Sequence, residues 1–294
     1  MLFRSTNNAG LTLTGPVILS ASRTLSTGVG AGNITITGTV TNTISRTLTL
    51  TAGTGNIDLQ SSIGGGTALA ALSASGTAIS LPTTNVSGNI QLTGTGAVTQ
   101  TGVLTAAGLE LLGAGGTHTL NTQNNAITTI AGNTGTVLFR DDTGFAVGTV
   151  NTAGLTTTGN TTFTTTGTVT QTAAVGAATL TLEGAGAVYT LGTAVSNAVT
   201  TLDANNSVLG TLIFRDDTGF AVAGITAGAN NVTLSSAGGT VTQSAVISCA
   251  TLILEGAGGI FTLGTQNNAV TTLDANNSVL GTLIFRDDTG FAVA

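Results

Sequence analysis

Hydrophobic and polar residues alternate in short runs along most of the chain. Val, Ile and Leu occupy every second position and Thr or Ser lies between them, as in Ile34-Thr35-Ile36 and Leu48-Thr49-Leu50. This period of two places the apolar side chains on one face of a β-strand. Gly and Asn separate the runs and indicate turns. Helical periodicity is nearly absent, so the pattern predicts an all-β protein.

The first 87 residues repeat with a short period. The run S-R-T-L at residues 22–25 returns at 45–48, and Gly32-Asn33 followed by Ile34-x-Ile36 returns at 55–59 after the same interval. This unit of about 22 to 23 residues holds two or three short strands with their turns, which is one coil of a solenoid. We expect Gly-Asn at the corners, since both residues tolerate positive φ.

From about residue 88 to 294 the period lengthens to some 71–75 residues. Residues 197–223 return letter for letter as 268–294, and a looser copy ends at Val147. This predicts a continuous solenoid of three repeat units, at about 76–147, 148–222 and 223–294. We interpret each unit as three or four coils, one of them enlarged around the motif F-R-D-D-T-G-F.

These features together predict a parallel β-solenoid. We expect a right-handed β-helix, because that hand is the more common one among such folds. Each strand would pair with the equivalent strand of the next coil, about 4.8 Å away. No end caps are recognisable, and Met1-Leu2-Phe3-Arg4 matches residues 137–140, as if the array were cut from a longer one. Because open sheet edges accept further strands, we expect a continuing chain or end-to-end self-association.

Composition excludes several classes of partner. The six basic residues are all Arg and are scattered, against 12 acidic residues and a net charge of −6. Phosphate binding needs a clustered basic surface, so we expect no nucleic-acid partner. No apolar run reaches the roughly 18 residues of a membrane span, and no signal peptide is recognisable. A single Cys excludes an internal disulfide.

Paired carboxylates in the long repeat are the first candidates for chemistry. A glycosidase needs two carboxyl groups about 5 to 9.5 Å apart across one bond. Adjacent strand residues point to opposite faces, however, and pairs in successive units would lie about 14 Å or more apart. We interpret Asp-Asp-Thr-Gly as a turn, with a calcium site as the alternative, although the G-G-x-G-x-D nonapeptide is missing. The candidates are Asp141, Asp142, Asp216, Asp217, Asp287 and Asp288.

Arg and Phe residues flank these pairs in every copy. We expect each Arg to contact a nearby Asp and steady the turn, contributing under about 1 kcal/mol if exposed. Each pair of Phe residues would pack together and close the enlarged coil. The residues are Phe139, Arg140 and Phe145; Phe214, Arg215 and Phe220; and Phe285, Arg286 and Phe291.

One position accepts three different rings. His118, the only histidine, aligns with Tyr189 and Phe261 in the later units. A site filled by His, Tyr or Phe calls for a flat ring, which favours a packing role over acid–base or metal chemistry. In the same way Cys249 replaces Ala106 and Ala177 as a small residue. We therefore expect no cofactor and no catalytic residue.

The glycine-asparagine motifs resemble a known family. G-N-I-T-I-T-G at 32–38, G-N-I-D-L at 55–59 and G-N-I-Q-L-T-G at 88–94 look like the repeats of filamentous haemagglutinin-like large exoproteins. The resemblance implies a right-handed parallel β-helix, secretion by an outer-membrane partner, and a shaft that holds adhesive regions away from the cell. The N-terminal secretion domain of that family is not recognisable in the chain.

From these features we expect a non-catalytic shaft segment of a bacterial secreted or surface fibre or adhesin. A host or surface glycan or protein would be its ligand. The alternative is a subunit of an extracellular filament that stacks end to end through open β-helix ends. A polysaccharide-acting β-helix enzyme is a third hypothesis, disfavoured because no unit carries a unique acidic, His and basic cluster. A loss of polysaccharide turnover in the Asp216→Asn variant would support this enzyme hypothesis.

Overall fold

The computed structural model describes residues 3–4, 8–192 and 195–294, and this part of the chain is all β-sheet, with 32 strands and no helix. Contacts divide the chain into two compact units. The first comprises Met1–Asp141 and Thr149–Ala153, and the second Asp142–Gly148 and Gly154–Ala294. The change of period near residue 87 lies inside the first unit.

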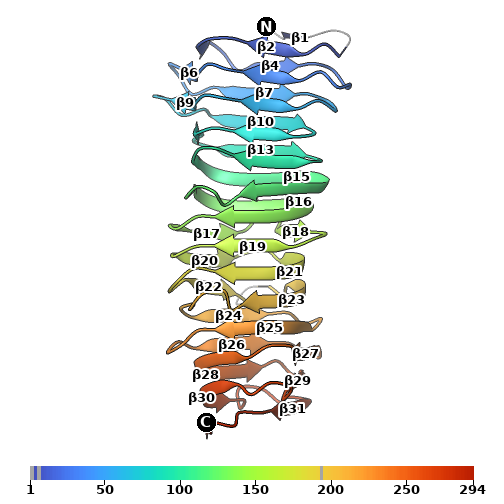
Figure 1. The fold of residues 1–294 in the computed structure, drawn as a ribbon, viewed down its shortest axis with the longest axis vertical. Helices are drawn as coiled ribbons and strands as arrows, with labels where there is room; N and C mark the ends of the chain where they lie inside the picture. Colours follow the sequence, from blue (N-terminus) through green and yellow to red (C-terminus); the bar gives the residue numbers. More distant parts are fainter. Residues whose placement is uncertain (1–2, 5–7, 193–194) are drawn as a thin grey trace. The chain divides into compact units, whose positions relative to one another are not determined.

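In the first unit the strands, which Figure 1 draws as stacked arrows, pair in parallel in three columns. The first column holds β2 (Leu11–Leu13), β5 (Ile34–Ile36), β8 (Ile57–Leu59), β11 (Ile79–Leu81), β14 (Ala97–Gln100) and the last parts of β15 (Leu104–Leu120) and β16 (Ala126–Arg140). The second holds β3 (Val17–Leu19), β6 (Val40–Asn42), β9 (Ile63–Gly65), β12 (Thr84–Asn85) and the first residues of β15 and β16. The third holds β1 (Phe3–Arg4), β4 (Arg23–Ser26), β7 (Thr47–Thr51), β10 (Ala71–Gly76), β13 (Asn89–Gly94) and the middle of β15 and β16.

The second unit has two columns that run through it without a break. One contains β17 (Gly144–Val147), β20 (Thr168–Gln171), β22 (Val188–Leu191), β24 (Leu212–Arg215), β26 (Val232–Ser235), the end of β28 (Ile247–Glu255), the end of β30 (Ala269–Asp274) and β32 (Ala292–Val293). The other contains β19 (Thr161–Thr164), the end of β21 (Val175–Glu183), the middle of β23 (Ala198–Ala204), the start of β25 (Phe220–Thr226), β27 (Thr240–Gln243), β29 (Ile260–Leu263) and β31 (Thr282–Phe285). This stacking confirms the predicted parallel β-solenoid, whose handedness stays a prediction.

The third column of the second unit is interrupted. It runs from β18 (Leu155–Thr157) through the first residues of β21 to Val199 in β23. A new third column begins elsewhere, where Ile225 aligns with Ala204, and continues to Ile247 and to the start of β30. The repeat copy at residues 197–223 therefore ends one column and begins another, which the alternation of residues alone does not reveal.

Alternate strand residues build the core. The inward residues of β5, Ile34 and Ile36, are buried, as are Leu48 and Leu50 of β7, while the Thr residues between them are partly exposed. Each buried Leu or Ile contributes roughly 1.5 to 3 kcal/mol relative to exposure. Since each inward residue stacks on a similar one in the next coil, the core is a continuous apolar line within each unit.

One register in the first unit differs from the sequence repeat. Leu11 pairs with Ile34 and Ile34 with Ile57, which is the shift that the sequence repeat predicts. Leu25, by contrast, pairs with Leu50, whereas the repeat aligns it with Leu48. A slip of two residues keeps every side chain on its face, so the pattern tolerates it.

The corner asparagines act through their side chains. Among the described residues other than Gly, only Asn8 has a positive φ, so the expectation of left-handed Asn at the corners is wrong. Asn33 Oδ1 instead accepts a hydrogen bond from the backbone nitrogen of Asn56 at 2.8 Å, and Asn56 Oδ1 accepts one from Ala78 at 3.2 Å. The corners thus carry a side-chain ladder that joins one coil to the next.

Candidate functional site

The turn between β24 and β25 contains a buried carboxylate. Asp216 is fully buried. Its Oδ2 accepts a hydrogen bond from the backbone nitrogen of Val199 at 2.6 Å, and its Oδ1 accepts from the backbone nitrogen and the hydroxyl of Thr218 at 2.9 and 2.6 Å. Val199 is where the third column ends, so the carboxylate takes the place of the carbonyl of a further strand.

The same contact recurs in the other copies. Asp287 Oδ2 accepts from the nitrogen of Val270 at 2.8 Å, and Asp141 Oδ2 accepts from the nitrogen of Ile127 at 2.6 Å. The coil that contains the turn is not enlarged as the sequence suggested, since Leu202 pairs directly with Val222 on the far side of the turn. The expected enlargement is absent because no further strand is needed here. The Asp216 carboxylate accepts the hydrogen bond of a backbone amide that another strand would otherwise accept.

The second Asp of the motif lies in an ion pair. Arg215 Nε donates to both carboxylate oxygens of Asp217 at 3.1 Å, and the terminal nitrogen contacts Oδ2 at 2.6 Å. This hydrogen bonding lowers the pKa of Asp217 below its usual value. Arg286 and Asp288 form the equivalent pair, and both of these side chains are half-exposed. Such pairs contribute at most about 1 kcal/mol.

The phenylalanines pack on one another across the turn. The Phe214 and Phe220 rings meet edge to face with their centroids 5.0 Å apart, and Phe285 and Phe291 do so at 5.1 Å. Phe145 also meets Phe163 of β19, which lies outside the motif, edge to face at 5.2 Å. Edge-to-face pairs add about 0.5 to 1.5 kcal/mol to the area they bury. Phe139 is fully buried in the first unit.

Glycine closes the turn. Gly219 has φ +89°, in the left-handed region, and a Cβ there would lie 2.5 Å from the carbonyl oxygen of Thr240. Gly290, the equivalent residue, has the same φ. The motif therefore needs Gly for both its conformation and its close approach to the next coil.

A shallow groove lies beside each of these turns in the second unit. The two grooves have volumes of about 480 and 490 Å³. Their common lining is built from equivalent positions of the two repeat copies: Ala198, Val199, Thr200, Thr218, Gly219, Phe220 and Ala221 in one, and Ala269, Val270, Thr271, Thr289, Gly290, Phe291 and Ala292 in the other. The exact sequence repeat thus produces one repeated surface feature.

His118, Tyr189 and Phe261 occupy equivalent places in the core. All three are fully buried, and each follows a Val in its column: Val98, Val169 and Val241. The Tyr189 hydroxyl lies 2.8 and 2.7 Å from the carbonyl oxygens of Phe163 and Glu183. His118 Nδ1 contacts the hydroxyl of Thr134 at 3.3 Å, while Nε2 has no hydrogen-bond partner. Burial lowers the pKa of His118 to about 4.

The acidic residues gather into no metal centre in the described ranges. No group of three or more His, Cys, Asp or Glu side chains there lies close enough to hold a metal ion. Both oxygens of Asp216 already accept hydrogen bonds from the protein. These contacts agree with the turn interpretation of Asp216, and the calcium alternative stays a hypothesis.

A buried amide pair recurs in each long repeat and was not singled out from the sequence. Asn197 Oδ1 accepts from Gln171 Nε2 at 3.0 Å and from the backbone nitrogen of Val175 at 2.8 Å. Its Nδ2 donates to the carbonyl oxygens of Leu191 and Arg215 at 2.9 and 3.0 Å. The sequence does contain a signal for this pair. The Gln of the recurring Val-Thr-Gln is a polar residue at a position that points inward. The equivalent pairs are Gln100 with Asn125 and Gln243 with Asn268.

Glu110 is a second buried polar residue that sequence reasoning missed. It is 1% exposed and accepts hydrogen bonds from Gln91, from Asn151 and from the backbone and hydroxyl of Thr152, all at 2.6 to 2.7 Å. Burial raises the pKa of Glu110, but these hydrogen bonds outweigh it and the net direction is downward. Glu110 thereby fastens the 149–153 segment to β13 and β15.

Comparisons with protein-family models, with curated proteins and with solved structures found no significant match. Over the described residues, no helix is long and apolar enough to cross a membrane. Inferences about function therefore depend on the repeat, the turn and the surface of the chain itself.

Proposed function

We propose that the chain is a non-catalytic structural shaft segment of a bacterial secreted or surface fibre or adhesin, located outside the cell. The observation that carries this proposal is the exact repeat of residues 197–223 at 268–294, which places the same turn and the same groove twice along the second unit. A stack of this kind gains length with each added unit, because each coil contacts only its neighbours.

The environment of the polar residues supports a structural role. Asp216 is buried against Val199, Asp217 is paired with Arg215, and His118 lies in the core with a depressed pKa. Asp216 and Asp217 thereby stabilise the turn, and His118 fills a ring position of the core. A site that recurs unchanged also suits a repeated surface better than a catalytic centre.

The repeated groove is the surface that would meet a ligand. Thr residues, small residues and Phe220 line it. This chemistry suits a host or surface glycan or an extended protein segment bound weakly at each copy. Several equal weak sites along one chain raise the overall affinity when the ligand also repeats.

A second candidate function is a filament subunit, in which another copy would cover β31 and β32. Val293 is 75% exposed and Phe291 37% exposed, whereas their identical counterparts Val222 and Phe220 are 0% and 4% exposed beneath the next coil. The chain would then be a filament subunit that covers this surface with another copy. In the shaft, a further coil of the same chain would cover it.

Mass photometry and electron microscopy of the purified chain over a range of concentrations distinguish the two candidates. The shaft predicts particles with the mass of one chain at every concentration. Filaments that lengthen with concentration would contradict it and favour the subunit. In that case Val293→Asp should stop the lengthening, and Val208→Asp, at another exposed valine, should leave it unchanged.

A further inference from the structure

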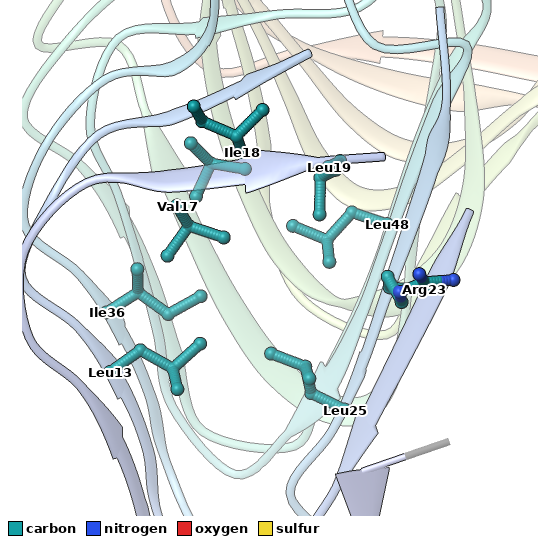
Figure 2. Close-up of a pocket in the computed structure, with 9 residues that line it drawn as sticks. Leu13, Val17, Ile18, Leu19, Arg23, Leu25, Ile36 and Leu48 are labelled. Atoms are coloured by element: carbon teal, nitrogen blue, oxygen red, sulfur yellow. The ribbon is translucent and has the colours of Figure 1, made fainter. Parts of the chain in front are cut away.

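A cavity of about 150 Å³ lies among the first coils of the first unit. Leu13, Val17, Leu19, Leu25, Ile36 and Leu48 line it from three columns of strands (Figure 2). Ligand sites in proteins are typically concave, mostly apolar and fitted with few polar groups. The lining carries one charged residue, Arg23.

Arg23 lies at a position that belongs to the core. In β4 it shares a face with Leu25, and it pairs with Leu48 of the next coil. The residues that follow Leu48 in this column are all apolar and buried: Leu72, Ile90, Leu109 and Ile130. Arg23 is only partly exposed, so it places a cation with one open side at the start of this line of Leu and Ile.

The guanidinium of Arg23 has only weak partners. It donates to the carbonyl oxygen of Ser22 at 3.2 Å and to the hydroxyl of Ser20 at 3.4 Å, both long for hydrogen bonds. Within the described residues Arg23 has no carboxylate in ion-pair distance. Figure 2 shows it beside Leu48 at the edge of the apolar cluster. An incoming anion would therefore replace two weak contacts with charge-assisted ones.

We propose that this cavity binds a small carboxylate with an apolar body of about one ring. A cavity of about 150 Å³ lined by Leu, Ile and Phe stays dry and accepts benzene in another protein, so the volume fits a single ring or a short alkyl chain. The apolar body enters among Leu13, Leu25 and Ile36, and the carboxylate meets Arg23 at the edge. The inference is independent of the shaft function.

Calorimetric titration of the full chain tests the proposal with benzoate, benzyl alcohol and acetate. Benzoate should bind about tenfold more tightly than benzyl alcohol, since a hydrogen-bonded charge favours the anion by about that factor. Acetate, which lacks the apolar body, should show no binding at the same concentrations. Benzoate and benzyl alcohol binding equally, or neither binding, would overturn the proposal.

Three variants assign the site. Arg23→Leu, which restores the apolar line, should weaken benzoate about tenfold and leave benzyl alcohol unchanged. Arg46→Leu is the matched control, because Arg46 stands in the same S-R-T-L motif outside the cavity lining, and it should alter neither ligand. Leu25→Phe should fill the cavity and abolish both. Unchanged benzoate affinity in Arg23→Leu, with circular dichroism matching the parent chain, would refute the assignment.

Discussion

Asp216 Oδ2 lies 2.6 Å from the backbone nitrogen of Val199, and this contact ends a column of the solenoid. In a continuous column a strand carbonyl would accept that hydrogen bond. The side chain takes its place, so the chain passes from β24 to β25 without a further strand over Val199. The same contact between Asp287 and Val270 makes this a rule of the long repeat.

Loss of the Asp216 carboxylate should destabilise the second unit. Asp216→Ala leaves the Val199 amide buried without a partner and removes the bonds from Thr218, so we expect a loss of about 3 kcal/mol in the free energy of unfolding. Asp217→Ala removes the partly exposed pair with Arg215 and an exposed hydrogen bond from the Ala237 amide, and should cost about 1 kcal/mol. Urea unfolding, with hydrogen exchange at Val199, measures both. Equal costs for the two variants would refute the column-ending role.

His118 should make the first unit sensitive to acid. Its pKa falls from 6.5 to about 4 in the folded chain because burial disfavours the imidazolium. Between these values the unfolded chain binds more protons. The contribution of His118 is therefore complete above pH 6.5 and declines as the pH falls toward 4, by up to about 3 kcal/mol.

His118→Phe, which places the ring of Phe261 in the equivalent site, isolates this effect. The difference in unfolding free energy between parent and variant should grow in favour of the variant as the pH falls from 6.5 to 4. Denaturant titrations at several pH values measure it. Tyr189→Phe is the control, expected to cost about 1 kcal/mol for its lost hydrogen bond at every pH in this range. A difference independent of pH for His118→Phe would contradict the prediction.

The buried amide pair should contribute more to the free energy of unfolding than an asparagine at a corner. Asn197→Ala leaves the Val175 amide without its side-chain partner and removes one hydrogen bond from each of the carbonyl oxygens of Leu191 and Arg215, and it should cost about 3 kcal/mol. Asn231→Ala, at an exposed corner, should stay within about 0.5 kcal/mol. Thermal and urea unfolding compare them. Similar values for both would mean that the amide pair contributes little.

Cys249 should resist alkylation in the folded chain. It is 3% exposed, and burial raises the pKa of its thiol to about 12 from 9. The thiolate fraction near neutral pH is then about a thousandfold lower than in an unperturbed thiol. Iodoacetamide should label Cys249 only when the second unit opens. Rapid labelling in the absence of denaturant would contradict the burial.

The alternation of residues was enough to predict the strands and their parallel stacking. Ile34-Thr35-Ile36 shows why, since its two Ile residues are buried and its Thr is not. The end of a column was not predictable in this way. The partners Asp216 and Val199 stand far apart in the sequence, as do Gln171 and Asn197, so only the coil geometry brings them together.

The candidate cavity was hidden for a different reason. The repeat of S-R-T-L at 22–25 and 45–48 aligns Arg23 with Arg46, whereas the structure pairs Arg23 with Leu48. A slip of two residues preserves which side chains point inward, and the sequence pattern is equally compatible with both registers. The energy of packing, which the pattern does not contain, selects one of them.

Appending a second copy of residues 224–294 after Ala294 tests the shaft directly. Because residues 197–223 and 268–294 are identical, the new junction reproduces the sequence around Ala223 and Gly224. The added segment forms a little more than three coils, so small-angle X-ray scattering should show the maximum dimension growing by about 15 Å with an unchanged cross-section. A wider particle of unchanged length, or an unfolded extension, would contradict the shaft.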